Sequence, residues 1–305
     1  MDEARLAEYL SAQTGAPVEV HSSHRLTVGH SRAMHVVDTS AGKFVVRVEQ
    51  GGVFGTSSAA EFALMQSLHA AAFPVANVRW LEPTGEVLGQ PFFVMDFVEA
   101  DQPAEERQMD TATAASFVRT LARLHAVEPT AHLPAVDPAQ TTHILIEHWR
   151  TVGKSAGGPR IPLLDAAEMW LHQNAPLSNR VTLVHGDAGP GNVLSTDGEV
   201  LALTDWEFAH VGDPAEDWSF CVSMRGSRTM SREAWLTQFE QEAGIRMTPA
   251  QWEYWEAFNL FKGACANRTC LGVFESGANR SPNMAIIGTA LHHVFLRRLV
   301  DIMRQ

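Results

Sequence analysis

Residues 183–218 carry acids at short intervals in a segment otherwise rich in Val, Leu and Gly: LVHGDAGPGNVLSTDGEVLALTDWEFAHVGDPAEDW. A carboxylate is costly to bury unless a cation or hydrogen-bond donors meet it. Two strand-like runs, VTLVHGD and VLALTDW, flank the turn STDGE. The segment is therefore expected to form a small β-ribbon, whose acids either cap turns or hold a metal and take part in chemistry.

Three polar residues of this segment are spaced so that the ribbon would bring them to one end. Asp187 follows His-Gly, Asn192 comes five residues later, and Asp205 comes thirteen residues after Asn192. A divalent cation that bridges nucleotide phosphates takes one or two carboxylates among its oxygen ligands. A separate carboxylate orients the attacking hydroxyl and accepts its proton. The combination indicates phosphoryl transfer; roles as turn caps and a loop amide would explain each residue singly, but not their joint placement.

The spacing HGD-x4-N followed by Asp-Trp-Glu is similar to the catalytic loop and later metal-binding Asp of kinases. HGDAGPGNVL and LTDWEFAHVGDPAEDW together resemble the paired signature of the aminoglycoside phosphotransferase and choline kinase-like superfamily, above all its bacterial and acyl-CoA dehydrogenase-associated branch. The resemblance implies a protein-kinase-like fold that uses ATP or GTP with Mg²⁺ to phosphorylate a hydroxyl. It makes Asp187 the catalytic base and Asn192 and Asp205 the metal ligands. His185 would brace the loop, and Asp217 would tie the ribbon to the following helix.

The order of the expected elements predicts an α+β, bilobal chain. Strand-like runs over residues 18–99, with one helix at 57–71, predict a small, mostly antiparallel sheet. Helical periodicity dominates after a polar break at 101–110, with helices expected at 114–127, 159–177, 231–244, 249–268 and 283–303. We therefore expect an N-terminal nucleotide-binding lobe at 1–98 and a C-terminal helical lobe at 99–305 that carries the ribbon. The cleft between two such lobes favours a small-molecule site.

Two parts of the N-terminal lobe correspond to nucleotide-binding elements of the resembled family. The loop in TVGHSRAMHVV supplies Gly29 and Ser31 where a phosphate-covering loop would lie. Arg47, in KFVVRVEQ, falls where the family has a Lys, and Glu61 on the next helix is its expected partner. This Arg departs from the family pattern, but its planar fork can bind a carboxylate and a phosphate at once. Lys43 begins the same strand and is ranked behind Arg47. Arg47 could also be an ordinary surface residue of the sheet, and Glu61 an ordinary solvated residue of the helix.

The hinge is expected in PFFVMDFVEA. The resemblance implies that residues 95–98, including Met95 and Phe97, contact the adenine. A plain core strand explains the apolar residues of this run equally well, so the sequence leaves the two interpretations open.

Composition limits the partners. The formal net charge is −12, from 35 acids against 23 bases, and this disfavours nucleic acid, which is bound by clustered Lys and Arg. The three cysteines form no CxxC pair and are expected to be free buried thiols. The N-terminus lacks the apolar region of a secretory signal, and no apolar run is long enough to cross a bilayer. We expect a cytoplasmic protein without a membrane partner.

The acceptor is the least constrained feature. Helix 249–268 places Trp252, Trp255 and Asn259 near one face, which fits either a box for a cation or ordinary core packing. An aminoglycoside-like, choline-like, sugar or polyol acceptor remains open. The leading interpretation is an O-phosphotransferase that moves the γ-phosphoryl group of ATP or GTP to a small-molecule hydroxyl. The alternative is a catalytically inactive pseudokinase that binds nucleotide or acts as a scaffold.

Overall fold

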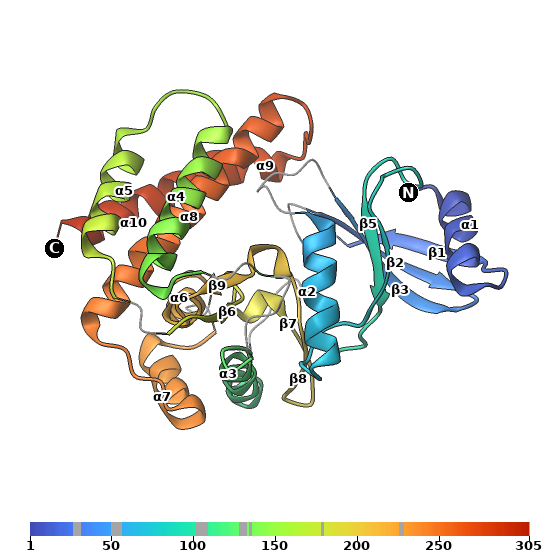
Figure 1. The fold of residues 1–305 in the computed structure, drawn as a ribbon, viewed down its shortest axis with the longest axis horizontal. Coiled ribbons are helices and arrows are strands. Elements are labelled where there is room, and N and C mark those ends of the chain that lie inside the picture. The colour runs from blue at the N-terminus through green and yellow to red at the C-terminus, as the bar shows by residue number, and fades with distance from the viewer. Residues whose placement is uncertain are drawn as a thin grey trace.

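An antiparallel sheet forms the N-terminal part of the protein, and helices form most of the C-terminal part (Figure 1). The computed structural model describes residues 1–26, 32–49, 57–101, 109–127, 133, 136–177, 180–225 and 229–304. The predicted α+β architecture is confirmed. Among the described residues, no helix has the length and apolar character needed to cross a membrane.

The sheet has five strands in the order β1-β2-β3-β5-β4, every neighbouring pair being antiparallel. The strands are β1 (Val20–Arg25), β2 (Arg32–Thr39), β3 (Gly42–Glu49), β4 (Val78–Glu82) and β5 (Phe92–Asp96). Helix α1 (Glu3–Thr14) packs on one face and helix α2 (Ser58–Ala70) lies on the other (Figure 1). Because side chains alternate along a strand, Val46 points into the α1 side of the core and its neighbour Arg47 points to the α2 side.

Helix α8 organises the C-terminal part, since it packs against α4, α5, α6 and α10. The helices are α3 (Thr111–Leu124), α4 (Pro138–Ser155), α5 (Pro162–Asn174), α6 (Ala215–Phe220), α7 (Arg232–Ala243), α8 (Pro249–Glu275), α9 (Pro282–Ile286) and α10 (His292–Met303). The single helix expected at 283–303 is divided by a π-helical turn at Ile287–Leu291. Helix α4 was not predicted; its first turns contain the β-branched pair Thr141 and Thr142, which have low helix propensity but are buried here.

The acidic segment forms two short ribbons instead of the single ribbon expected from the sequence. Strand β6 (Thr182–Val184) pairs with β9 (His210–Gly212), and β7 (Val193–Thr196) pairs with β8 (Glu199–Leu203). The expected pairing of VTLVHGD with VLALTDW is therefore wrong. Asp197 and Gly198 have positive φ values of 50° and 81°, which suits a tight two-residue hairpin. This turn pairs β8 with the strand just before it and leaves β6 to pair with β9.

The core at α3 gives a matched test of the packing. Leu121→Ala removes a side chain with no exposed area and is expected to lower the free energy of unfolding by about 2–5 kcal/mol, because a cavity remains. Leu177→Ala, at a side chain that is 85% exposed, is expected to change it by less than about 0.5 kcal/mol. Urea unfolding of the two variants and the parent measures both values. Equal midpoints for the two variants would contradict the assigned core.

Candidate active site

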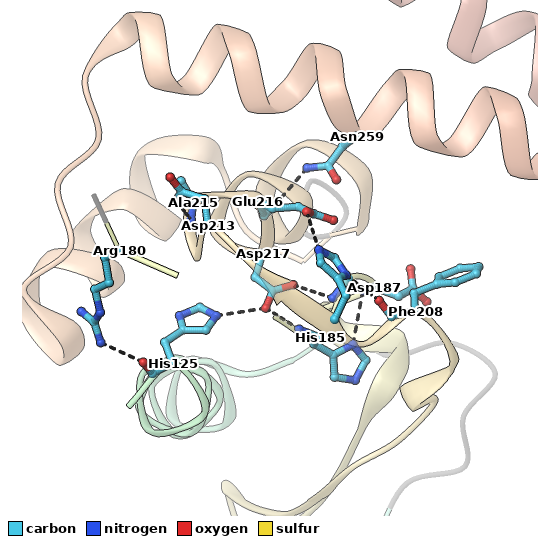
Figure 2. A network of polar contacts seen from close by, with 12 residues as sticks. His125, Arg180, His185, Asp187, Phe208, Asp213, Ala215, Glu216, Asp217 and Asn259 are labelled. Carbon is cyan, nitrogen blue, oxygen red and sulfur yellow. Dashed lines mark hydrogen bonds and ion pairs between the residues drawn. The ribbon is translucent and has the colours of Figure 1, made fainter. Parts of the chain in front are cut away.

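A buried carboxylate on α6 holds the loop that follows β6. Asp217 has no exposed area and accepts hydrogen bonds from the backbone N–H groups of His185 (2.8 Å) and Gly186 (2.9 Å). The Nε2 of His125 donates to the same carboxylate at 3.0 Å (Figure 2). Burial alone would raise the pKa of Asp217, but these donors hold it below its ordinary value. Asp217 thus ties the loop to the following helix, as predicted.

His185 braces the loop from within. Its Nε2 lies 3.0 Å from the carbonyl oxygen of Thr204, and its Nδ1 accepts the backbone N–H of Asp187 at 3.3 Å. A neutral ring with its proton on Nε2 satisfies both contacts. The ring therefore braces the loop, as predicted, and also connects it to the residue that precedes Asp205.

Gly186 is required by close packing. Its φ is 79°, a left-handed value that favours glycine. A Cβ at this position would lie 2.5 Å from the carbonyl oxygen of Phe208. The loop that carries Asp187 is thereby seated directly on the segment that follows Asp205.

The structure brings Asp187 and Asn192 together. The Nδ2 of Asn192 donates to the Asp187 carboxylate at 2.6 Å and to the Asp187 backbone oxygen at 2.9 Å. Asn192 ends a short 3₁₀ turn at Pro190–Asn192, and its own carbonyl oxygen accepts the N–H of Thr204 at 3.0 Å. These contacts fix the carboxylate and place the amide beside the start of the Asp205 turn.

Asp205 meets the N-terminal sheet through Arg47. The Nη2 of Arg47 donates to the Asp205 carboxylate at 2.8 Å, and its Nε donates to Glu61 at 3.0 Å. Glu207 lies 4.0 Å from the same Nη2. Asp205 itself has φ 67° and ψ 64°, a left-handed conformation uncommon for a residue other than glycine and often found at functional sites. The structure thus pairs Arg47 with Glu61 as predicted, and adds two carboxylates that the sequence did not assign to it.

The guanidinium group of Arg47 is buried among acids. Burial alone would lower its pKa, but Glu61, Asp205 and Glu207 raise it above its ordinary value. The Asp205 side chain keeps 28% of its area exposed, so this carboxylate faces solvent as well as Arg47. Among the residues that the structure describes, one guanidinium group thus meets three carboxylates.

The family model described as "Phosphotransferase enzyme family" matches residues 24–258. The chain belongs to this phosphotransferase family. The predicted family is confirmed.

One curated relative is similar to this chain in sequence, and two solved structures are similar to it in fold. Acyl-CoA dehydrogenase family member 10 of Mus musculus is 27% identical over 267 residues, which cover 77% of this chain but 25% of that protein. The crystal structure of choline kinase LicA from Streptococcus pneumoniae superimposes with a TM-score of 0.68 at 15% identity, covering 98% of this chain and 99% of LicA. Spectinomycin phosphotransferase in complex with ADP and spectinomycin gives 0.63 at 12% identity, covering 99% and 97%. The predicted kinase-like fold is confirmed.

The other predicted nucleotide-binding residues are less fully defined. Gly29 and Ser31 lie outside the described residues. Met95 is half-buried on β5 and packs against the same core cluster as α2. Phe97 donates its backbone N–H to the carbonyl oxygen of Lys43 at 3.2 Å, and the Lys43 ammonium lies 3.9 Å from the centre of its ring. Lys43 is thus engaged at Phe97, whereas Arg47 forms the contact with Glu61.

The aromatic residues of α8 belong to the core. Trp252 stacks on Phe239, while Trp255 packs in a separate cluster with Phe258. Asn259 is fully buried and donates to the backbone oxygen of Glu216 at 3.0 Å. The interpretation of these residues as a box for a cation is wrong, and the core interpretation is correct.

Sequence analysis missed Lys262, which lies on α8 behind the loop that carries Asp187. Its ammonium donates to the backbone oxygen of Gly186 at 2.6 Å. Its only sequence signal is its place in the apolar run LFKGA, in a chain with only three lysines.

Replacement of Arg47 tests the cluster of carboxylates. Arg47→Met leaves Glu61, Asp205 and Glu207 without their shared cation and is expected to lower the free energy of unfolding by about 3–5 kcal/mol. Arg47→Lys keeps the charge and is expected to lose less. Arg79→Met is the matched control, because Arg79 forms a half-exposed pair with Asp96 on the same sheet; such pairs contribute about 0–1 kcal/mol. Urea unfolding measures all three, and similar losses for Arg47→Met and Arg79→Met would contradict the assigned role.

Proposed function

We propose that this phosphotransferase moves the γ-phosphoryl group of ATP or GTP to a hydroxyl of a small molecule. Asp187 acts as the base, and Asn192 and Asp205 hold Mg²⁺. The observation that carries the proposal is the contact of the Asn192 amide with the Asp187 carboxylate at 2.6 Å, in a loop held by Asp217 and His185. A carboxylate fixed in this way can orient an attacking hydroxyl.

Asp187 has the simpler task. Its carboxylate accepts a hydrogen bond from the acceptor hydroxyl and takes up its proton as the oxygen attacks the γ-phosphorus atom. The bond to the β–γ bridging oxygen breaks, and the nucleoside diphosphate leaves. The Asn192 amide on one carboxylate oxygen fixes the direction in which the other oxygen is presented.

The residues present fit a magnesium site completed by the nucleotide. Within the described residues, no three His, Cys, Asp or Glu side chains converge as a metal-binding group. Mg²⁺ rarely uses an all-protein cage and is bound by one or two carboxylates together with phosphates and water. Asp205, with its partly exposed carboxylate, and the Asn192 amide match that requirement. When bound, the ion would neutralise charge that develops on the phosphate oxygens.

The nucleotide would be held from the N-terminal sheet. Arg47, fixed by Glu61, would direct its other arm at the phosphates; that arm binds Asp205 in this structure. We assign Gly29 and Ser31 to the phosphate-covering loop and Met95 and Phe97 to the adenine side. The ADP in the spectinomycin phosphotransferase complex supports ATP as the nucleotide, and the roles of these four residues follow from the resemblance of the motifs. The acceptor class is an alcohol of aminoglycoside, choline or related type.

One contact favours a second candidate function. Because Arg47 occupies the Asp205 carboxylate at 2.8 Å, a protein that kept this pair would bind nucleotide without the metal and transfer no phosphate. This is the behaviour of a pseudokinase. The two candidates differ in whether nucleotide binding depends on Mg²⁺.

Asp187→Asn tests the proposed base. The amide can still accept a hydrogen bond from Asn192 but cannot take up a proton, so kcat is expected to fall about 10²–10⁴-fold with nucleotide binding retained. Asp197→Asn is the matched control, because this Asp occupies the β7–β8 turn at φ 50°, a conformation that Asn tolerates well.

The assay offers Mg²⁺ and ATP or GTP with a panel of aminoglycosides, macrolides, choline-like amines, sugars and hydroxy amino acids. Transfer is detected as the mass gain of the acceptor, and nucleotide binding by thermal shift with and without Mg²⁺. Turnover by Asp187→Asn at the parent rate would refute the assigned base. Nucleotide binding that ignores Mg²⁺, with no transfer by the parent, would establish the pseudokinase.

A further inference from the structure

A lysine is buried directly behind the catalytic loop. The Lys262 side chain on α8 is 3% exposed, and its ammonium lies 2.6 Å from the Gly186 carbonyl oxygen and 2.5 Å from the Glu216 carboxylate. Lysine is almost never fully buried unless it is paired. Burying this ammonium costs free energy, and the contacts with the Gly186 oxygen and the Glu216 carboxylate offset that cost.

The Glu216 carboxylate joins this lysine to a histidine. Its second oxygen lies 3.1 Å from the Nε2 of His210, and the Nδ1 of His210 lies 2.8 Å from the Phe208 carbonyl oxygen. Both neighbours of the ring can only accept, so His210 carries a proton on each nitrogen. Burial alone would lower the pKa of His210, but Glu216 raises it above its ordinary value. Glu216 is thus an anion between two cations.

The two arms of this network end on segments that touch each other. The Lys262 arm ends at the Gly186 oxygen, and the His210 arm ends at the Phe208 oxygen. Gly186 packs against that Phe208 oxygen so closely that no Cβ would fit. Figure 2 shows Glu216 between Phe208 and Asn259, whose amide holds the Glu216 backbone. One buried carboxylate therefore fixes the Asp187 loop and the segment after Asp205 together.

The contact with Gly186 acts on the peptide bond that leads into Asp187. Lys262 holds the oxygen of this peptide, and His185 Nδ1 accepts its N–H at 3.3 Å. Because the peptide group is planar, contacts at its two ends fix the direction in which the Asp187 Cα leaves the loop.

We propose that Lys262 is a positioning residue for phosphoryl transfer, which acts through the Gly186 carbonyl to hold the Asp187 carboxylate in line with the acceptor hydroxyl. The proposal rests on the proposed function. Lys262 is too buried to reach the nucleotide or the acceptor, so it is not a catalytic residue. Buried ion pairs contribute little net stability, whereas small errors in the position of a reacting group are expensive.

Lys262→Met removes the ammonium and keeps the length of the side chain. We expect kcat for transfer from MgATP to fall about 100-fold, with the KM for MgATP unchanged because the nucleotide contacts lie elsewhere. Transfer is measured to the acceptor found in the panel, or to water as ADP release if none is found. Lys154→Met is the matched control, since Lys154 is exposed near the end of α4, and its kcat is expected to equal that of the parent.

A second variant separates positioning from folding. Lys262→Met leaves Glu216 with His210 as its cation. The double variant Lys262→Met/Glu216→Gln removes the carboxylate as well, so His210 is expected to lose its extra proton, which leaves an uncharged network that is expected to fold. The Gly186 carbonyl still lacks its donor, so kcat is expected to stay as low as in the single variant. Circular dichroism and thermal unfolding check the fold of each protein.

The outcomes are distinguishable. A folded double variant with the kcat of the parent, or a raised KM with an unchanged kcat, would overturn the positioning role alone. Failure of both variants to fold would assign the network to folding and overturn the positioning role as well. A parent that transfers no phosphate to any acceptor or to water would overturn the proposed function, and the positioning role with it.

Discussion

Two consecutive buried carboxylates at the start of α6 hold the segments of the site together. Asp217 accepts the backbone N–H groups of His185 and Gly186, while Glu216 faces Lys262 and His210. Side chains at neighbouring helix positions diverge, so the pair reaches two sides of the same loop. Each carboxylate is costly to bury alone, and each is compensated by donors from segments distant in sequence. The fold must therefore bring those segments together before either acid can be buried.

Arg47 makes the corresponding link across the two parts of the chain. It belongs to β3 of the N-terminal sheet, yet one of its arms binds Asp205, 158 residues further along. The planar guanidinium has separate donors for Glu61 and for a second acceptor. The ammonium group of a lysine would have to donate to both acceptors from one nitrogen atom. The exchange of Lys for Arg therefore suits a site in which the same side chain must hold an acid on the helix and remain available to a second anion.

The local pattern of the sequence was sufficient for the sheet and for most helices, because each has a period of two or of about 3.6 residues. It failed where tertiary contacts decided the outcome. The pairing of β6 with β9 depends on two intervening turns, and the Thr-rich start of α4 becomes helical through burial. The proximity of Asp187 and Asn192 follows from spacing along a motif, whereas the Arg47–Glu61 pair was expected from the resemblance to kinases. Lys262 could not be found in this way, since a single cation in an apolar helix has no periodic partner.

The two charged networks differ in how they meet solvent, and this difference fits their tasks. The Glu216 and Asp217 carboxylates have no exposed area and both bind donors from the protein, so they are expected to keep one geometry during a reaction cycle. Asp205 is partly exposed and is held by Arg47 in a left-handed conformation. If a nucleotide bound together with a metal ion, Arg47 could bind a phosphate group instead of Asp205. Asp205 could then bind the metal ion instead of Arg47. Each of the two groups would exchange one partner of opposite charge for another, so the Arg47–Asp205 pair would be able to rearrange while the buried network would keep Asp187 in position.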